Sequence, residues 1–378
     1  MIYFDNASTT SISDIVADRA YSFIKNDFAN PSSLHSLGFN IEKDINKARK
    51  IIASILSVNS DELYFTSGGT EANNTAILGV AEASKRRGNK VITAVTEHPS
   101  VLDSFTELEN RGFEVVKLAV DSSGRIDINE LESQVDDNTI LVSIMYVNNE
   151  TGVIQDIEKI YSVIKKRNNN CIFHTDCVQA FGKHIIKGCF ADIITISAHK
   201  LHAFKGVGAM YIKKGIRVKP LHIGGSQEMG FRGGTENTLG IVAFGIAAQE
   251  AVNNIDVNIN KVKKVRDELL LITKSLAGVH INGDINICSP YILNLSFEDV
   301  KAEVLLHTLE NEGIYVSTGS ACSSKVKQKM KVVDYIINGR GQGAIRFSFS
   351  SYNTVEEAKI VIDCLNRVIP MLRKFVPR

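Results

Sequence analysis

Six short runs of β-forming residues, most of them apolar on both faces, constrain the fold of this chain more than any other feature. They cover residues 63–65, 91–95, 115–118, 140–144, 171–174 and 193–196, and helix-length segments separate them. Strands that are apolar on both faces are typical of parallel sheets covered by helices on both sides. The pattern therefore predicts an α/β fold with a mostly parallel sheet. Ligands of such sheets bind at the carboxyl ends of the strands.

The pattern changes in the last third of the chain. Residues 239–276 contain few helix breakers and predict a long connecting helix, after which short strands at 292–297, 314–317 and 344–349 alternate with helices. The final helix, 354–375, begins with the capping-box pair Thr354 and Glu357. We therefore expect a large α/β domain over residues 13–255. A small α+β domain should comprise residues 256–378 together with 1–12.

Composition narrows the class of protein. The chain has 378 residues and a formal net charge of +1, which gives no reason to expect binding to nucleic acid. Its most apolar stretch, 239–248, has roughly half of the ~20 residues needed to cross a bilayer. Residues 1–6 do not resemble a signal peptide, and the six cysteines include no C-x-x-C pair. We expect a cytoplasmic protein with reduced thiols and no direct membrane contact. The histidines lack metal-ligand spacing, so no metal site is predicted.

Three polar features follow predicted strands. The sequence TSGGTE at 66–71 is a glycine turn before a helix, a weak signal for phosphate binding. Asp176 and Gln179 follow the strand at 171–174, and Lys200 follows the strand at 193–196. Each alone could equally be a satisfied polar strand end. Together they match what pyridoxal phosphate requires, namely a phosphate grip, an acid for the pyridine nitrogen and an amine for the aldehyde.

These residues belong to a longer series of motifs that resembles the cysteine desulfurases of the NifS/IscS kind. That group lies within the class V, fold-type I pyridoxal-phosphate enzymes, so the resemblance implies a fold-type I transferase. The motifs cover nearly the whole chain: YFDNASTT (3–10), NPSSLH (30–35), TSGGTE (66–71), TEH (96–98), VNNETG (147–152), HTD (174–176), SAHK (197–200), RGGTEN (232–237), GSAC (319–322) and IRFS (345–348).

The resemblance implies a role for each matching residue. Lys200 would hold the cofactor as a Schiff base and move the α-proton, and Asp176 would keep the pyridine nitrogen protonated. His98 would stack on the ring and take part in acid–base steps, while Gln179 would bond the phenolic oxygen. The residues implied for the phosphate are Gly69, Thr70, Ser197, His199 and, from the partner subunit of a homodimer, Thr235.

Arg346 and Cys322 would act on the substrate. In residues 344–350 apolar side chains alternate with polar ones, and an arginine on the polar face suits two-point capture of a carboxylate. The resemblance assigns this task to Arg346, with Asn149 helping. Cys322 lies in the small-residue stretch 317–324, which predicts a mobile loop. A run of lysines at 325–331 would favour its thiolate, or else form a solvated face or meet an acidic partner.

The function that follows from the resemblance is L-cysteine desulfurase. L-cysteine would become L-alanine, and its sulfur would form a persulfide on Cys322. The persulfide would then pass to a sulfur-acceptor protein for iron–sulfur cluster assembly or for tRNA or cofactor thiolation. The alternatives are selenocysteine lyase or another class V reaction, and a sulfur-relay protein kept mainly for partner binding. Two departures from the family pattern motivate the last alternative: Ala203-Phe204 replaces a usual Gly-Pro pair, and Met229 replaces a usual arginine.

Overall fold

The computed structural model describes residues 1–318, 332–336 and 343–374. Its central sheet has seven strands in the order β2-β8-β7-β6-β5-β3-β4. Neighbouring strands from β7 to β4 run parallel, whereas β8 is antiparallel to both β7 and β2. The strands are β2 (Leu63–Thr66), β3 (Lys90–Ala94), β4 (Glu114–Leu118), β5 (Thr139–Ser143), β6 (Ile172–Asp176), β7 (Ile193–Ser197) and β8 (Gly208–Ile212). The prediction of a mostly parallel sheet is confirmed.

All six strands predicted from the sequence form, but β8 was missed. Its buried residues GAMYI directly follow Gly206 and Val207, and the glycines on either side of Val207 suggest a loop rather than a strand. The omission matters because β8 inserts between β7 and β2 and makes the sheet mixed.

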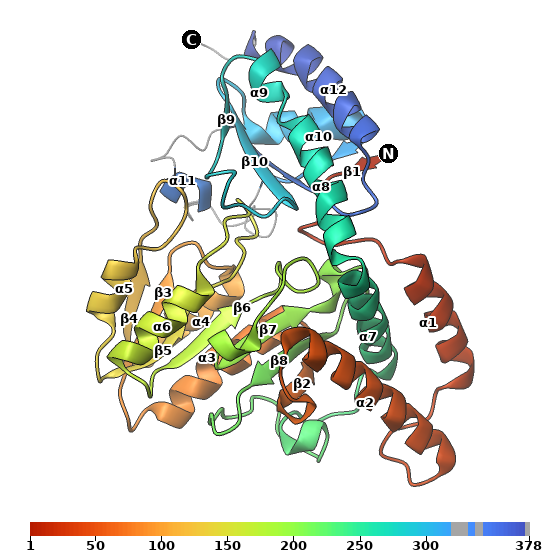
Figure 1. The fold of residues 1–378 in the computed structure, drawn as a ribbon, viewed down its shortest axis with the longest axis vertical. Coiled ribbons are helices and arrows are strands. Elements are labelled where there is room, and N and C mark those ends of the chain that lie inside the picture. Colours follow the sequence, from red (N-terminus) through yellow and green to blue (C-terminus); the bar gives the residue numbers. More distant parts are fainter. Residues whose placement is uncertain (319–331, 337–342, 375–378) are drawn as a thin grey trace.

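Helices cover both faces of the sheet (Figure 1). One face packs against α3 (Gly69–Ser84) and α4 (Pro99–Asn110). The opposite face packs mainly against α2 (Ser36–Leu56), α6 (Ile157–Arg167) and α7 (Thr238–Asn253), with α5 (Ile128–Gln134) beside α6. Helix α1 (Asp14–Asn26) lies against α7. Burial on both sides explains why the strands are apolar on both faces.

A second, smaller apolar cluster surrounds the antiparallel sheet β12-β10-β9. The N-terminus lies in this upper part of Figure 1, because β1 pairs in parallel with β11. The elements of this part are β1 (Ile2–Tyr3), α8 (Ile255–Leu269), α9 (Ile272–Ser275), β9 (Val279–Ile281), β10 (Ile292–Phe297), α10 (Ala302–Asn311), β11 (Ile314–Tyr315), α11 (Val332–Ile336), β12 (Ala344–Ser348) and α12 (Val355–Arg373).

The long connecting helix predicted over 239–276 is broken, and this expectation is corrected. Asn254 ends α7 and precedes α8, and a second break separates α8 from α9. Phe244 of α7 belongs to the large apolar cluster, whereas Val262 of α8 belongs to the small one. We therefore propose a domain boundary at the start of α8, with residues 1–12 assigned to the small domain because Ile2 and Phe4 pack there.

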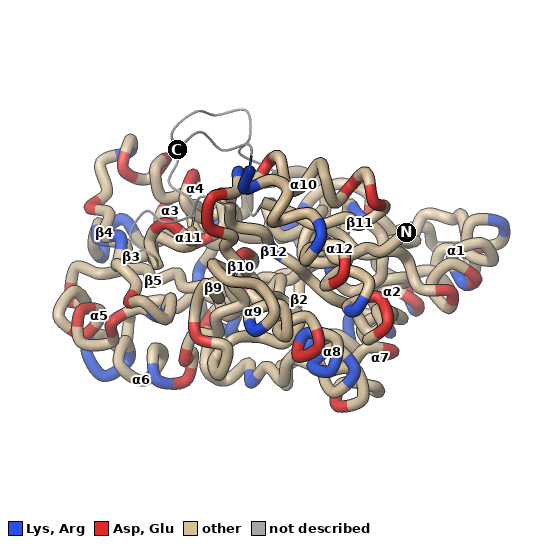
Figure 2. The backbone as a smooth tube through the Cα atoms, turned by 90° about the horizontal axis from the view of Figure 1, so that it is seen from above, with Lys and Arg blue, Asp and Glu red and all other residues tan. Residues whose placement is uncertain are grey.

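The predicted capping box at the last helix is confirmed. The backbone N–H of Glu357 donates to Thr354 Oγ1 at 3.2 Å, and the Thr354 N–H donates to the Glu357 carboxylate at 3.0 Å. Among the described residues, no helix combines the length and apolar character needed to span a bilayer. Basic and acidic residues are interspersed along the chain rather than gathered by sign (Figure 2).

Candidate active site

A cavity of about 490 Å³ lies at the carboxyl ends of β6 and β7, bounded also by residues 5–8 and by β12. Ten residues predicted from the sequence line it: Gly69, Thr70, His98, Asn149, Asp176, Gln179, Ser197, His199, Lys200 and Arg346. They come from strand ends, helix starts and turns that are distant in sequence. The fold thus brings together most of the residues that the sequence singled out.

One wall of the cavity is suited to a phosphate. Helix α3 begins there at Gly69, and its N-cap Gly68 offers no side-chain acceptor to the first N–H groups. The hydroxyl of Ser197 is buried and has no hydrogen-bond partner within the described chain. A Cβ added at Gly69 would lie 2.9 Å from Val178 Cγ2, which is too close for an ordinary contact. Glycine at this position avoids that clash. An anion would satisfy the helix N-terminus and the Ser197 hydroxyl together.

Asp176 is held by donors on both carboxylate oxygens. The Val178 N–H donates to Oδ1 at 2.8 Å, and Asn73 Nδ2 donates to Oδ2 at 2.7 Å. The same Asn73 amide donates to Ser100 Oγ at 2.9 Å and accepts from Thr195 Oγ1 at 2.5 Å. These two donors fix the orientation of the Asp176 carboxylate at the cavity.

Asn73 is a site residue that the sequence analysis missed. It is fully buried on the face of α3 that packs against the sheet. The sequence did contain a signal for it, because Asn73 is a polar residue among the apolar residues Ala72, Ala76 and Ile77. A buried amide in such a position needs hydrogen-bond partners.

His98 is the N-cap residue of α4, next to Pro99. Its Nδ1 accepts from the Ser100 N–H at 3.1 Å, so in the neutral ring Nε2 carries the proton. Burial lowers the pKa of His98; the negative charge of Asp176 opposes this effect, and the positive charge of Lys200 adds to it. The ring is therefore neutral at pH 7, as a stacking and proton-transfer group requires.

Lys200 ends a short 3-10 turn, Ala198–Lys200, directly after β7. Its Nζ donates to the backbone carbonyls of Ala7 and Ser8, each at 2.6 Å. The neighbouring His199 has a pKa lowered to about 4, first by burial and then by the charge of Lys200. The N-terminal segment therefore holds the amine at the cavity.

Gln179 is also tied to that segment. Its Nε2 donates to the Ala7 carbonyl at 2.9 Å, while its Oε1 accepts from Lys183 Nζ at 3.4 Å. Burial, reinforced by the charges of Lys200 and Arg346, lowers the pKa of Lys183 to about 7. Lys183 did not stand out in the sequence, because its neighbours Lys200, Tyr291 and Arg346 are distant from it in sequence.

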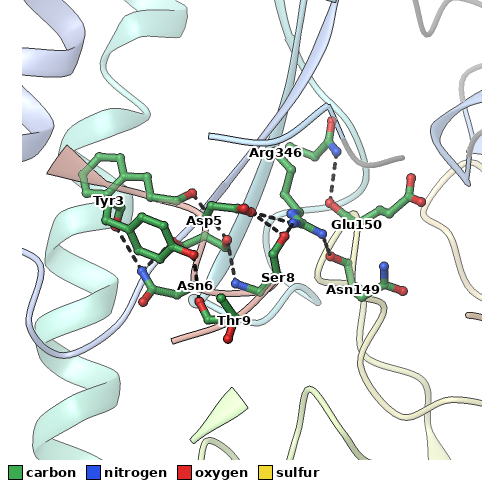
Figure 3. A network of polar contacts seen from close by, with 12 residues as sticks. Tyr3, Asp5, Asn6, Ser8, Thr9, Asn149, Glu150 and Arg346 are labelled. Carbon is green, nitrogen blue, oxygen red and sulfur yellow. Dashed lines mark hydrogen bonds and ion pairs between the residues drawn. The ribbon is translucent and has the colours of Figure 1, made fainter. Parts of the chain in front are cut away.

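Arg346 reaches the cavity from β12 and is almost fully buried. Its Nη1 donates to the Asn149 carbonyl at 2.9 Å, and its Nη2 lies 2.7 Å from Asp5 Oδ1 and 2.6 Å from Ser8 Oγ (Figure 3). The predicted polar face of β12 is therefore buried rather than solvated. Arg346 on this face contacts Asn149 and the N-terminal residues Asp5 and Ser8.

One predicted residue, Thr235, lies outside the cavity lining, and another, Cys322, is not among the described residues. Thr235 lines a separate hollow with Ser67 and Gly206, so it does not enter the cavity of its own chain. Cys322 lies outside the described residues, as do the lysines at 325–331.

The two departures from the family pattern have different surroundings. Ala203 is buried and Phe204 packs against the large apolar cluster, so this pair is accommodated by the core. Met229 has a φ of 57° and is exposed. The preceding Glu228 is buried and anchors this segment through an ion pair of 2.7 Å with Arg49.

Comparison with known proteins finds similarity over nearly the whole chain. The model of the family described as aminotransferase class V matches residues 2–361. A relative from Dictyoglomus turgidum, named cysteine desulfurase IscS, is 40% identical over 100% of this chain and 96% of its own length. The structure of a NifS-like protein superimposes with a TM-score of 0.92 at 36% identity, covering 98% of this chain and 99% of the other. A structure described as SspA in complex with cysteine has a TM-score of 0.81 at 30% identity, covering 94% and 100%.

Proposed function

Because this chain belongs to the class V aminotransferase family and is an L-cysteine desulfurase, we propose that pyridoxal 5'-phosphate binds in the cavity at the ends of β6 and β7. Enzymes of the family use this cofactor. The observation that carries the proposal is the convergence of an amine, Lys200, a fixed carboxylate, Asp176, and an anion cradle at Ser197 in one cavity. The fold is accordingly that of a fold-type I enzyme.

The residues divide the work of holding the cofactor. Asp176, fixed by Asn73 and Val178, would carry the hydrogen bond to the pyridine nitrogen, and Lys200 would hold the aldehyde carbon covalently. The phosphate would bind at the N-terminus of α3, and Gln179 would hydrogen-bond to the phenolic oxygen of the ring. When bound, pyridoxal phosphate supplies an electron-withdrawing ring that stabilises negative charge at the substrate α-carbon.

The same cavity offers groups for the substrate. Arg346, supported by Asn149, would bind the carboxylate of L-cysteine. Lys200, once displaced by the substrate amine, would take the α-proton and return a proton later. His98, neutral with its proton on Nε2, would lie against the ring and serve acid–base steps.

Cys322 would receive the sulfur, a role supported by its GSAC motif. Its thiolate attacks the substrate sulfur, the bond between that sulfur and the β-carbon breaks, and the new S–S bond leaves a persulfide on Cys322. The electron pair of the broken bond remains with the carbon fragment, which takes up protons and leaves as L-alanine. The balance is L-cysteine plus one thiol giving L-alanine plus one persulfide.

The chain is proposed to act as a homodimer in the cytoplasm. Thr235 stands outside the cavity of its own chain, where it could reach the phosphate of a partner. Large apolar side chains near the α1–α2 connection, Phe28, Leu34 and Phe39, are exposed in the single chain, and a partner subunit would cover them. The persulfide would pass to a sulfur-acceptor protein of iron–sulfur cluster assembly or of tRNA or cofactor thiolation.

The test compares two cysteine variants with the wild type. Incubated with pyridoxal phosphate, Cys322→Ala should develop the same cofactor absorbance near ~420 nm but form no persulfide from L-cysteine. Cys189→Ala is the matched control, because Cys189 is an exposed free thiol away from the cavity, and it should retain both properties.

Full persulfide formation in Cys322→Ala would contradict the role of that thiol. If Cys322→Ala still released selenium from selenocysteine but no longer acted on cysteine, this result would instead favour selenocysteine lyase. Absence of cofactor attachment at Lys200 after borohydride reduction would overturn the whole proposal.

A further inference from the structure

The guanidinium proposed to bind the substrate carboxylate already has a carboxylate beside it. Asp5 Oδ1 lies 2.7 Å from Arg346 Nη2, in an ion pair whose side chains are 20% and 4% exposed, respectively. Asp5 also lines the cavity (Figure 3). The pair joins residues 341 positions apart in sequence, so the fold brings them together rather than local geometry.

Asp5 occupies the part of the guanidinium that a substrate needs most. An arginine can bind a carboxylate at two points through Nε with Nη2, or through Nη1 with Nη2, so both edges use Nη2. Here Nη2, Asp5 Oδ1 and Ser8 Oγ lie 2.6–2.8 Å from one another. Nη1 donates to the Asn149 carbonyl, whereas Nε is buried without a partner in the described chain. Nη2, which both edges use, is therefore already engaged by Asp5 and Ser8, and a substrate carboxylate must share it with Asp5.

Asp5 also affects the stability of Arg346 itself. Arg346 is almost fully buried, and a buried charge without a counter-ion is strongly destabilising. Asp5 supplies that counter-ion and, together with Ser8, fixes the orientation of the Arg346 guanidinium. A substrate carboxylate then brings a second negative charge to one guanidinium, so the attraction of Arg346 is partly cancelled before the substrate arrives.

We propose that Asp5 is a specificity-determining residue that shares Arg346 with the substrate and holds down its affinity for carboxylates. This inference rests on the proposed role of Arg346 as the carboxylate-binding residue. Removal of the Asp5 charge with its shape retained, in Asp5→Asn, should strengthen binding of ligands that carry a carboxylate. Ligands without a carboxylate should be unaffected.

The test is calorimetric titration of the cofactor-loaded protein with two thiols that cannot complete the reaction. 3-Mercaptopropionate has the carboxylate but no amine, and cysteamine has the amine but no carboxylate. Asp5→Asn should bind 3-mercaptopropionate about tenfold more tightly than the wild type, or about 1.4 kcal/mol. Its affinity for cysteamine should change less than about twofold, a change below 0.5 kcal/mol on the same scale.

Three further variants separate the possible outcomes. Ser8→Ala removes the other Nη2 contact without changing charge, and it should leave the affinity for 3-mercaptopropionate within about threefold of the wild type. Asp5→Ser removes the charge with a smaller side chain and should reproduce the gain if Asp5→Asn does not fold. Unchanged or weaker binding in the charge-removed variants would overturn the proposal. Arg346→Gln should lose affinity for 3-mercaptopropionate; if it does not, the carboxylate role of Arg346 itself is wrong, whichever way Asp5 behaves.

Discussion

Replacement of Lys183 by methionine should stabilise this protein, and more so at low pH. Lys183 Nζ is buried beside Lys200 and Arg346, with Gln179 Oε1 at 3.4 Å and the Tyr291 ring centroid at 5.5 Å. No carboxylate of the described chain lies within ion-pair distance of it. Burial and the two neighbouring cations lower its pKa from 10.5 to about 7.

The magnitude follows from proton linkage. At pH 6 the lysine is charged in both states, and a pKa lowered from 10.5 to about 7 corresponds to roughly 5 kcal/mol of lost stability. Methionine fills a similar volume without charge, but it loses the hydrogen bond and the contact with the Tyr291 ring, which offset about 2 kcal/mol. Lys183→Met should therefore gain roughly 3 kcal/mol at pH 6.

The pH dependence has a definite sign. Between pH 7 and 10.5 the unfolded wild type binds a proton that the folded form has released, so wild-type stability rises with pH in this window. The methionine variant lacks this contribution. Its advantage should shrink by roughly 3 kcal/mol between pH 6 and pH 9.5.

Urea unfolding of the wild type, Lys183→Met and Lys166→Met at the two pH values measures these differences. Lys166 is an exposed lysine paired with Glu132, and its replacement should change the free energy of unfolding by less than about 0.5 kcal/mol. A gain at pH 6 below about 1 kcal/mol, or one that is the same at both pH values, would refute the reasoning.

Two other buried groups give predictions of the same kind. Asn73→Ala should lower the free energy of unfolding by about 3 kcal/mol and weaken pyridoxal phosphate binding, because Asp176 loses a donor. Urea unfolding and cofactor titration measure these two effects. Asn74→Ala is the control, because Asn74 does not contact Asp176, and it should affect cofactor binding little. Burial raises the pKa of Glu97 well above 4.5, so the folded wild type keeps a proton that the unfolded chain releases, and its stability falls as pH rises. Glu97→Gln can keep the 2.7 Å bond from the Met145 N–H and should be more stable than the wild type at pH 8, with the gain lost by pH 4; a gain that persists at pH 4 would contradict the assignment.

The sequence was sufficient to predict the residues that stand at the ends of buried strands. Apolar runs locate β6 and β7, and the rule that ligands bind at the carboxyl ends of parallel strands directed attention to Asp176 and Lys200. The resemblance to a known family then added Arg346, which the structure places in the same cavity.

What the sequence did not reveal depends on contacts between distant segments. The sequence pattern indicates the burial of Asn73, which is a polar residue on an apolar helix face. It does not indicate the hydrogen bond from Asn73 to Asp176. Lys183 looks like an ordinary surface lysine in the sequence, and its burial beside Tyr291 and Arg346 appears only in the structure. The break at Asn254 was missed although Asn253 and Asn254 are both weak helix formers, and the packing of α7 and α8 in different apolar clusters appears only in the structure.

Asp5, Ala7 and Ser8 line the cavity, and the position of this N-terminal segment has a consequence for how the protein matures. The Ser348 N–H donates to the Phe4 carbonyl at 2.7 Å, and Ile2 pairs with Ile314. The segment that orients the Lys200 amine therefore finds its partners in β11 and β12 only after nearly all of the chain has left the ribosome. Contacts so distant in sequence close late and slowly. A nascent chain can complete the α/β sheet early, but the cavity that the first residues and β12 enclose is completed only near the end of synthesis.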